Sequence, residues 1–463
     1  MISHNFHHTI LRSYDIRGVV GVTLFNTDAF SIGLTFGTIT KNNGKGKVVV
    51  CRDGRISSEE LSKHLIDGLI SSGCDVIDIG QGPTPMLYFA DLFFDANSSI
   101  QVTGSHNPAN YNGFKFVLNH NSFFAKDIQN LGELSSKGIN IAKKGSLQEI
   151  QIFKEYTNRL KLEISFNDFG VAWDAGNGVT GPIIEEITSD RKKHIKLFCD
   201  VDGNFPNHHP NPVEPKNLID LKKVVNEKKL VCGLGFDGDG DRVGLIDGKG
   251  RLIPGDILTA YLSSEIVKKQ NNSIILFDIK SSNTALNFVK KIGGKPMISK
   301  TGHSFMKSKL KETNAPLAGE MSGHIFISDN YYGYDDAVYV AIRLLNLINY
   351  NIEKNGISIT EFVDNLPKSY STPECKIECP EEKKFKIIED IKVNVISKIP
   401  LKQINTLDGI RVNKDNGWWL IRASNTESTI IVRIEGNNQN ELENLILEVK
   451  SFLKIAKINW KGP

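Results

Sequence analysis

The chain has 463 residues, and its 56 lysines and arginines nearly balance its 53 aspartates and glutamates, which leaves a formal net charge of +3. This length exceeds a single core and predicts several domains, while the balanced charge gives no sign of a nucleic-acid partner. No apolar run reaches the roughly 20 residues that span a bilayer, and the first residues lack the features of a secretory signal, so we expect a cytoplasmic protein with no membrane partner.

Apolar runs in the first third of the chain predict a series of strands. These runs are residues 47–51, 75–80 and 98–103. After the first run, Ser57 and Glu60 have the spacing of a capping box, and apolar residues at three- and four-residue intervals from Leu61 to Ile70 predict a helix. We expect this helix to end near Gly73.

The same alternation of apolar run, polar loop and helical pattern continues through the middle of the chain. The next strands are expected at residues 170–174, 230–234 and 274–278. Strands that alternate with helices predict largely parallel sheets that are covered by helices. We therefore expect three α/β domains, at residues 1–153, 154–254 and 255–368.

The C-terminal part of the sequence has a different pattern. Residues 373–382 are charged and interrupted by prolines, which indicates a connector without regular structure. Beyond it, residues 428–434 alternate as a half-buried strand does, and apolar residues from Leu442 to Leu453 have helical spacing after Asn438 at the cap position. We expect a fourth, smaller α+β domain at residues 369–463.

The loops that follow strands are the places to look for chemistry, because ligands of open α/β sheets bind beyond the carboxyl ends of the strands. One such loop is TGSHNPANYNGFK, residues 103–115, which places Ser105 directly after a predicted strand. Asn-Pro and Asn-Gly are turn dipeptides, so taken alone the segment is an ordinary loop. The alternative is that Ser105 is a nucleophile or a phosphate carrier.

A second loop reads DGDGDR and carries Asp237, Asp239 and Asp241. Three carboxylates at alternate positions, separated by glycines, can converge on one divalent cation. An EF-hand calcium loop would need glycine at position 242 and glutamate at position 248, where this chain has Arg242 and Gly248. Magnesium or manganese, with open positions for phosphate oxygens, is the better interpretation than calcium or a solvated acidic turn.

Other loops contain clusters of polar residues that, taken singly, are weaker evidence for a functional site. Residues 319–324 combine a carboxylate, a hydroxyl and an imidazole that suit sugar hydroxyls, and residues 300–304 place a lysine and a histidine in a glycine turn. Residues 422–427 begin with an arginine, whose planar fork matches phosphate. Residues 14–18 place another arginine in a turn. Each of these is also compatible with an ordinary turn or helix cap.

These motifs follow one another along nearly the whole chain as YDIRG (14–18), TGSHNP (103–108) with NGFK (112–115), DGDGDR (237–242), KTGHS (300–304), GEMSGH (319–324) and RASNTE (422–427). In this combination the sequence resembles the α-D-phosphohexomutase superfamily, and specifically its phosphomannomutase/phosphoglucomutase branch. The resemblance implies an α/β four-domain architecture, with three related α/β domains and a C-terminal α+β domain around a central cleft. That architecture agrees with the alternation of strands and helices described above.

The resemblance also implies a role for each matched residue. Ser105 would carry the transferable phosphoryl group, and Asp237, Asp239 and Asp241 would bind Mg²⁺ together with a phosphoserine oxygen. Tyr14, Arg17, Lys115 and Arg242 would complete the reacting end, and Lys115 and His324 are the candidates for the general base. The residues expected to bind substrate are Tyr14, Arg242, Lys280, His303, Glu320, Ser322, His324, Arg422, Ser424, Asn425 and Thr426.

The implied reaction is a reversible transfer of phosphoryl between C6 and C1 of a hexose phosphate. It would proceed through a phosphoserine and a hexose 1,6-bisphosphate, which also serves as activator. The sequence leaves the choice between mannose and glucose phosphates open. The alternatives are a phosphoglucosamine mutase, a non-catalytic sugar-phosphate-binding protein and a metal-dependent phosphatase. We expect a monomer, because no coiled-coil or swapped-arm pattern is present.

Overall fold

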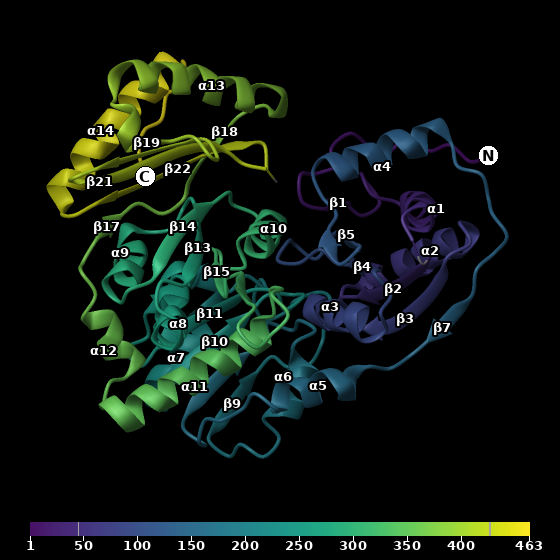
Figure 1. Cartoon of the computed structure of the whole chain (residues 1–463), viewed down its shortest axis with the longest axis horizontal. Helices are drawn as coiled ribbons and strands as arrows, with labels where there is room; N and C mark the ends of the chain where they lie inside the picture. Colours follow the sequence, from purple (N-terminus) through teal and green to yellow (C-terminus); the bar gives the residue numbers. More distant parts are fainter. Residues whose placement is uncertain (45, 426) are drawn as a thin grey trace.

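The computed structural model describes residues 1–44, 46–425 and 427–463, and these residues form four sheets, which are arranged around a common centre (Figure 1). The strands of the first sheet are β1 (Ile16–Val19), β2 (Lys47–Arg52), β3 (Asp75–Gln81), β4 (Ser98–Val102), β5 (Tyr111–Leu118), β6 (Asn121–Ser122) and β7 (Leu147–Glu149). The helices that accompany it are α1 (Asn26–Asn42), α2 (Ile56–Ser71), α3 (Thr84–Phe93) and α4 (Lys126–Lys137).

The apolar run of β2 explains why helices cover both faces of this sheet. Val48 and Val50 pack in the cluster that includes α1 and α2, whereas Val49 and Cys51 pack in the cluster that includes α3. Side chains alternate between the two faces of a strand, so a strand that is buried on both faces needs a continuous apolar run. The sequence of β2 meets this requirement.

The second and third sheets are built from the middle of the chain. The second comprises β8 (Val171–Asp174), β9 (His194–Leu197), β10 (Cys232–Phe236), β11 (Val243–Asp247) and β12 (Leu252–Ile253), with α5 (Phe153–Lys161), α6 (Gly181–Ile187) and α7 (Ile219–Glu227). The third comprises β13 (Ile274–Asp278), β14 (Lys295–Ser299), β15 (Leu317–Gly319) and β16 (Ile325–Ile327), with α8 (Gly255–Lys269), α9 (Asn283–Lys291), α10 (His303–Thr313), α11 (Ala337–Asn355) and α12 (Ile359–Asp364).

These three sheets share one strand order. It is β3-β2-β4-β5 in the first, β9-β8-β10-β11 in the second and β14-β13-β15-β16 in the third. In each case the last strand runs antiparallel to the strand before it, while the others are parallel. The loop between these last two strands therefore starts at the carboxyl end of a parallel strand. The equivalent loops contain Ser105, residues 237–242 and residues 320–324.

The fourth sheet is entirely antiparallel. Its elements are β17 (Tyr370–Ser371), β18 (Cys375–Glu378), β19 (Ile404–Asn405), β20 (Ile410–Lys414), β21 (Gly417–Ala423) and β22 (Thr429–Gly436), with α13 (Glu381–Lys398) and α14 (Gln439–Ile455). One face is apolar and packs on α13 and α14. The helices lie on the outer side of the sheet in Figure 1, so its other face is turned toward the third domain.

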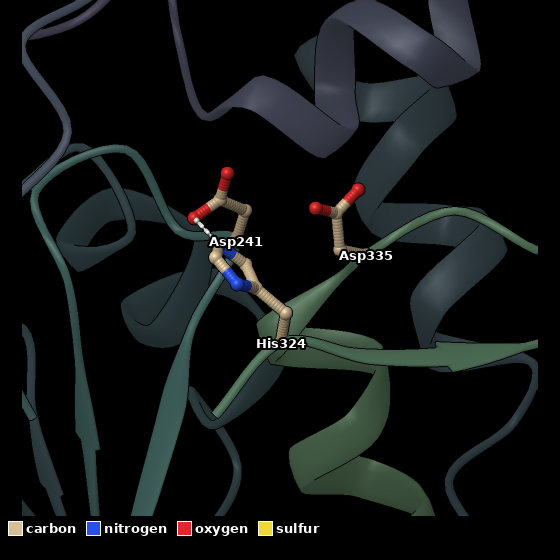
Figure 2. A group of neighbouring side chains, drawn as sticks. All are labelled: Asp241, His324 and Asp335. Carbon is tan, nitrogen blue, oxygen red and sulfur yellow. Dashed lines mark ion pairs between the residues drawn. The ribbon is translucent and has the colours of Figure 1, made fainter. Parts of the chain in front are cut away.

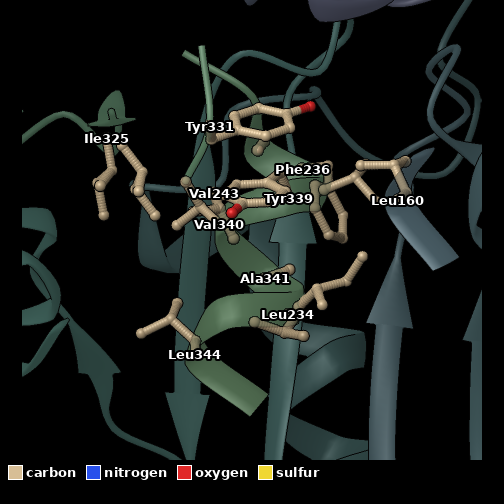
Figure 3. Close-up of a cluster of buried hydrophobic side chains, with 14 of the residues drawn as sticks. Leu160, Leu234, Phe236, Val243, Ile325, Tyr331, Tyr339, Val340, Ala341 and Leu344 are labelled. Atoms are coloured by element: carbon tan, nitrogen blue, oxygen red, sulfur yellow. The ribbon is translucent and has the colours of Figure 1, made fainter. Parts of the chain in front are cut away.

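The first three domains share a continuous apolar core, whereas the fourth has its own. The shared core runs through α11, whose Tyr339, Val340 and Leu344 pack with Leu234 and Phe236 of the second sheet (Figure 3). A helix of the third domain thus buries its apolar face on a strand of the second. Burial of apolar surface between domains stabilises their relative placement.

The expected fold is confirmed: three α/β domains and a C-terminal α+β domain are present. The side chain of Asn438 accepts from the backbone of Glu441 at the start of α14, as expected. Two local predictions are wrong. Residues 373–382 contain β18, which pairs with β22, and α2 starts at Ile56 with Arg55 as its N-cap and no side-chain capping bond. Ser57 instead accepts a hydrogen bond from Asn112 at 2.8 Å.

All six cysteines lie in the described part of the chain, and all six are free thiols. Among residues 1–44, 46–425 and 427–463, no helix combines the length and the apolar character that crossing a lipid bilayer requires.

The contact between α1 and α2 generates a stability prediction. A Cβ at Gly33 would lie 2.1 Å from the carbonyl oxygen of Leu65, and a Cβ at Gly68 would lie 2.1 Å from that of Phe30. Helix propensity alone favours Gly33→Ala by about 1 kcal/mol, but the backbones would have to separate, and overpacking costs about 1–3 kcal/mol. We expect Gly33→Ala to lower the midpoint of thermal unfolding by several degrees.

The matched control is Asn42→Ala, at an exposed position of the same helix, where the gain in helix propensity is not opposed by a clash. Thermal unfolding followed by circular dichroism compares the two variants with the wild type. A midpoint for Gly33→Ala at or above the wild-type value would contradict the close helix contact.

Candidate active site

The buried acidic loop between β10 and β11 is the centre of the site. Asp237, Asp239 and Asp241 each offer a carboxylate oxygen within 4.8 Å of the others, and all three are at most 1% exposed. Gly240 has φ 74°, in the left-handed region that glycine adopts freely, and so lets the loop turn sharply. Asp237 Oδ1 accepts from the backbone nitrogens of Asp241 and Arg242, at 3.0 and 3.1 Å.

The negative charge of this loop is compensated from the first domain. The Lys115 ammonium on β5 donates to Asp239 at 2.7 Å and also to Asp241. Although burial lowers it, the three carboxylates raise the pKa of Lys115 above its ordinary value. For Asp237, burial and the charges of Asp241 and Asp239 raise the pKa well above the usual range. For Asp239 and Asp241 burial raises the pKa, but Lys115 and, at Asp241, also His324 bring it below the ordinary value, so the repulsion that remains in the loop falls on Asp237.

Ser105 faces this loop from the junction of β4 and β5. Its backbone has φ 48°, which is uncommon for a residue other than glycine. Its Oγ donates to Asp237 Oδ2 at 2.9 Å and lies 3.2 Å from His106 Nδ1. Burial and the nearby Arg242 charge lower the pKa of His106 well below its ordinary value, so the ring is neutral. The serine hydroxyl is thus in contact with the acidic loop from a different domain.

The third domain contributes His324 and Glu320 to the same place. His324 Nδ1 lies 2.8 Å from Glu320 Oε2, and its Nε2 lies 3.2 Å from Asp241 Oδ1. Although burial lowers it, the Asp241 carboxylate raises the pKa of His324 to about 9, and Arg242 opposes this shift. Figure 2 shows His324 next to Asp241, and across from them Asp335, a carboxylate that no sequence motif indicated. Ser322 Oγ is 3.5 Å from Glu320 Oε2.

Two groups of carboxylate and imidazole side chains could therefore hold a metal: the acidic loop, and the set of Asp241, His324 and Asp335. The acidic loop fits better, because three oxygen donors suit Mg²⁺. Its Asp239 Oδ1 is buried without a hydrogen-bond partner among the described residues. The second set likewise has a buried oxygen without a partner among the described residues, Asp335 Oδ2, so the preference rests on the three oxygen donors of the loop against the mixed nitrogen and oxygen donors of the second set.

A second cluster lies at the edge of the fourth domain. Arg422, 2% exposed, donates from Nε to Asp408 Oδ2 at 3.1 Å, and its Nη2 has no hydrogen-bond partner among the described residues. Asn425 donates to the hydroxyl of Tyr14 in the first domain. Ser424 Oγ accepts from the backbone of Glu427 at 3.1 Å. Thr426, which was expected here, lies outside the described residues.

The loop at residues 300–303 joins the two clusters. The backbone nitrogen of Gly302 donates to Glu320 at 2.5 Å, and that of Thr301 donates to Asp408 at 3.1 Å. The carbonyl oxygen of Thr301 accepts from the Tyr14 hydroxyl at 2.7 Å. His303 follows, with its ring centre 5.6 Å from that of His324. One short loop thus contacts Tyr14 of the first domain, Asp408 of the fourth domain, and Glu320 of the third domain, which belongs to the loop expected to bind sugar hydroxyls.

The remaining expected residues lie at the edges of this arrangement. Arg17 donates to the carbonyl oxygen of Gly104 at 2.9 Å, directly before Ser105. Lys280 does not reach the acidic loop; it pairs with Glu374 at 2.7 Å, in the segment that enters the fourth domain. Every expected site residue that the structure describes is therefore in one of the two clusters or next to them.

Several polar residues support the site but were not expected to. The buried ones are Asp53, Arg55, Thr84 and Asp335, and the half-buried Glu374 and Asp408 join them. Thr84 Oγ1, for example, donates to Asp239 Oδ2 at 2.6 Å from the start of α3. Each contributes one side chain from a loop or helix start that is distant in sequence from its partner. The sequence did contain a signal for Asp53 and Arg55, because they directly follow the predicted strand at residues 47–51, just as the residues of the site loops follow their strands.

Models of known families match four segments of this chain. Those named phosphoglucomutase/phosphomannomutase, alpha/beta/alpha domains I, II and III match residues 8–136, 153–250 and 254–370, and the model of the C-terminal domain matches residues 374–451.

Curated relatives and a solved structure carry the same family names as these models. The chain is 40% identical over 457 residues, 98% of this chain and 97% of the relative, to a phosphomannomutase/phosphoglucomutase of Pseudomonas aeruginosa. It is 36% identical over 455 residues, 97% and 98% of the two chains, to a phosphoglucomutase of Neisseria meningitidis. A crystal structure of a phosphoglucomutase/phosphomannomutase family protein from Burkholderia thailandensis superimposes with a TM-score of 0.91 at 36% identity, over 99% of this chain and 100% of that chain.

The repulsion between the carboxylates of the acidic loop generates a prediction about divalent cations. Because a cation at this loop would relieve the repulsion of its carboxylates, we expect millimolar Mg²⁺ to raise the midpoint of thermal unfolding relative to EDTA. Binding at 100 times the dissociation constant stabilises by about 2.7 kcal/mol. Asp239→Asn should lose most of this rise.

The control is Asp67→Asn, at an exposed position of α2, which should retain the full rise. Differential scanning calorimetry of the three proteins with Mg²⁺ and with EDTA makes the comparison. An equal rise in Asp239→Asn and wild type would place the cation elsewhere.

Proposed function

The chain belongs to the phosphoglucomutase/phosphomannomutase family, and from this we propose that it is a phosphohexomutase that moves phosphoryl reversibly between C6 and C1 of mannose phosphate, glucose phosphate or both. The observation that carries the proposal is the contact between Ser105 and the acidic loop, with Oγ 2.9 Å from Asp237 Oδ2. This contact brings a hydroxyl that can carry phosphoryl to a set of carboxylates that can hold a divalent cation.

We propose that Ser105 carries the phosphoryl group between the two ends of the sugar. A direct transfer from C6 to C1 would require the group to cross the ring. A phosphoserine avoids this, because it donates phosphoryl to the free hydroxyl and so forms a hexose 1,6-bisphosphate. After this intermediate turns in the cleft, its other phosphate returns to Ser105, and the product leaves. The same bisphosphate phosphorylates Ser105 when the enzyme starts without phosphate.

Asp237, Asp239 and Asp241 would hold one Mg²⁺, with an oxygen of the phosphoserine as a further ligand. The bound cation supplies positive charge next to the transferred phosphoryl group, whose transfer depends mainly on positioning and on charge stabilisation. Arg17 and Arg242 add further positive charge at the same end. The unpartnered oxygen of Asp239 supports this assignment.

The proton of the attacking sugar hydroxyl needs a base, which returns it to the leaving oxygen in the reverse step. Lys115 and His324 are the candidates, and both contact Asp241. Although burial lowers it, the neighbouring carboxylates raise the pKa of both side chains, so each holds its proton in this structure and can donate it. A cation bound at the loop would have to lower that pKa before either side chain could accept a proton. His324 is also fixed by Glu320 on its other nitrogen, which sets the orientation of the ring. We propose that His106 orients the serine and does not act as the base toward the sugar, because its Nδ1 lies 3.2 Å from Ser105 Oγ itself.

The sugar and its distant phosphate would be bound by the remaining residues. Glu320, Ser322 and His324 would bind the sugar hydroxyls, with His303 and Lys280 beside them. Arg422, Ser424, Asn425 and Thr426 would hold the phosphate that is not reacting, together with Tyr14. The Nη2 of buried Arg422, which has no hydrogen-bond partner among the described residues, supports an anion at this position, because a buried guanidinium is stabilised by charged acceptors.

Three further expectations remain proposals. We propose domain limits at residues 1–153, 154–254, 255–368 and 369–463, a monomeric state, and a cytoplasmic location. The six free thiols support the last of these, because cytosolic proteins keep their cysteines reduced.

The proposed reaction is tested by ³¹P NMR of the purified protein with Mg²⁺, a trace of hexose 1,6-bisphosphate, and mannose 1-phosphate or glucose 1-phosphate. We expect a 6-phosphate signal to grow without free inorganic phosphate, and Ser105→Ala to abolish this growth. The relative rates give the preferred sugar.

The other outcomes identify the alternatives. Faster turnover of glucosamine 6-phosphate than of both hexose phosphates would indicate a phosphoglucosamine mutase. Release of inorganic phosphate in step with loss of substrate would indicate a phosphatase. Binding of sugar phosphates without turnover, and without phosphate on Ser105, would indicate a non-catalytic binding protein.

The phosphate-binding role of Arg422 has its own test. Loss of a hydrogen bond to a charged group costs about 1.5–3 kcal/mol, so we expect Arg422→Ala to raise KM about 10- to 100-fold. Phosphorylation of Ser105 should persist, since the acidic loop is untouched. Steady-state kinetics and intact-protein mass spectrometry measure the two effects.

Lys386→Ala, at an exposed position of α13 in the same domain, is the control and should retain the wild-type KM. An unchanged KM in Arg422→Ala for both sugar phosphates would count against a phosphate clamp at this position.

A further inference from the structure

Asp53 and Arg55 lie in the loop between β2 and α2. Among the described residues, their hydrogen-bond partners belong neither to the acidic loop nor to residues 319–324, the loop expected to bind sugar hydroxyls. Both side chains are at most 1% exposed, and Arg55 Nε donates to Asp53 Oδ2 at 3.1 Å. Burial of a charged pair is costly unless further hydrogen bonds satisfy the remaining donors and acceptors. The partners of this pair therefore indicate what it does.

The guanidinium of Arg55 binds the backbone of the loop that carries Ser105. Its Nη2 donates to the carbonyl oxygens of Ser105 and Asn107, at 2.7 and 2.6 Å. Its Nη1 donates to those of Pro108 and Tyr111, at 2.5 and 3.0 Å. The planar guanidinium of Arg55 thus binds four carbonyl groups that span the whole turn from Ser105 to the start of β5.

Asp53 holds the other side of the same loop. Its Oδ2 accepts from the hydroxyl of Thr103 at 2.8 Å and from the backbone nitrogen of Gly104 at 3.1 Å. The Thr103 hydroxyl oxygen in turn accepts from the backbone nitrogen of Ser105 at 2.7 Å. Asp53 and Arg55 therefore fix the backbone nitrogen and the carbonyl oxygen of the residue that faces the acidic loop.

This support matters because the backbone of Ser105 is strained. A residue with a side chain in the left-handed region costs of the order of 1–3 kcal/mol and persists only where its surroundings enforce the conformation. At φ 48°, Ser105 directs its Oγ to Asp237. If the turn relaxed to an unstrained conformation, the hydroxyl would be displaced from the acidic loop.

The pair is also held by the second domain. The Arg55 guanidinium lies 5.1 Å from the ring centre of Phe205, a favourable cation–aromatic arrangement. A Cβ at Gly203 would lie 2.6 Å from the carbonyl oxygen of Gly54, and a Cβ at Gly238 would lie 2.7 Å from that of Ser105. The Ser105 turn is therefore enclosed between Arg55 and the backbone of the acidic loop.

We propose that Arg55, fixed by Asp53, is a positioning residue that holds Ser105 in the conformation needed for phosphoryl transfer. The inference rests on the proposed phosphoserine reaction. We attribute the positioning of Ser105 to the fixed arrangement of N–H donors on the planar guanidinium of Arg55, because four carbonyl groups in different directions need several fixed donors. A lysine at this position would keep the positive charge but offers only a compact ammonium on a flexible stem.

The test compares Arg55→Lys with wild type and with a control, Arg343→Met. Arg343 is also a buried arginine, in α11, where it pairs with Asp329 at 3.2 Å, and it has no role in the proposed reaction. Three quantities are measured: kcat and KM for the sugar phosphate, the rate at which glucose 1,6-bisphosphate phosphorylates Ser105, followed by intact-protein mass, and the midpoint of thermal unfolding.

We expect Arg55→Lys to lower kcat about 10²-fold, the order of effect that misplacement by about 1 Å produces. The rate of Ser105 phosphorylation should fall in parallel, and KM should remain unchanged, because neither Arg55 nor Asp53 is among the proposed phosphate and sugar contacts. Arg343→Met should lower the unfolding midpoint and leave kcat unchanged. A purely structural role of Arg55 would instead give the Arg343→Met pattern, and so would overturn the proposal.

Two further outcomes are decisive. Wild-type kcat in Arg55→Lys would overturn the proposal, because charge alone would then suffice. Absence of phosphate on Ser105 of the wild type after incubation with the bisphosphate and Mg²⁺ would overturn the proposed function, and this inference with it. If wild-type Ser105 is phosphorylated, the proposed function stands, and the kcat of Arg55→Lys decides whether Arg55 positions Ser105.

If Arg55→Lys does not fold, Thr103→Val tests the same arrangement. It keeps the shape of the side chain and removes the hydroxyl between Asp53 and the backbone of Ser105. We expect kcat to fall about tenfold, the equivalent of one hydrogen bond, at unchanged KM. An unchanged kcat in this variant would overturn the proposal as well.

Discussion

Three carboxylates buried in one short loop impose the constraint on which the rest of the molecule depends. At separations of up to 4.8 Å and an effective dielectric constant of 20, each pair repels by roughly 3 kcal/mol or more. The β10–β11 loop has one cation of its own, Arg242, which is fewer than its three carboxylates, so further compensation comes from Lys115 of the first domain and His324 of the third. Since both must reach the loop, three separate sheets have to meet at one point. Their continuous apolar core holds them in this arrangement.

The fourth domain is attached in a different way. The face of its sheet that is not covered by α13 and α14 carries Arg411, Arg422 and Arg433, and it contacts the third domain both through hydrogen bonds and through a small apolar cluster of Ile279, Trp418 and Leu420. Arg411, for example, donates to the carbonyl oxygens of Ile279 and Ser281, both at 2.7 Å. An interface of this kind, with only a small apolar cluster, can separate without exposing a large apolar surface. This suits the proposed reaction, in which the bisphosphate must turn within the cleft between two transfers.

The sequence was most informative where several functional residues are contiguous. The alternation of strands and helices predicted all four domains, and residues 237–242 and 422–427 could be identified as site loops because their polar residues are close together in the chain. Asp408 and Asp335 could not be identified in this way, since each supplies a single carboxylate to partners far away in sequence. The strand β18 was missed for a related reason: it is four residues long, and its pairing partner β22 lies more than fifty residues further along the chain.

The failed prediction of a capping box at the start of α2 shows how the site overrides local structure. A side-chain cap is worth about 1 kcal/mol, and the spacing of Ser57 and Glu60 would have provided one. In the structure the N-cap is Arg55, without a side-chain capping bond, and the side chains around this helix start are directed to the Ser105 turn. Places where sequence rules fail are often places where function sets the geometry. Here the local stability that α2 forgoes and the strain stored at Ser105 have the same cause, since both result from holding one hydroxyl against a buried acidic loop.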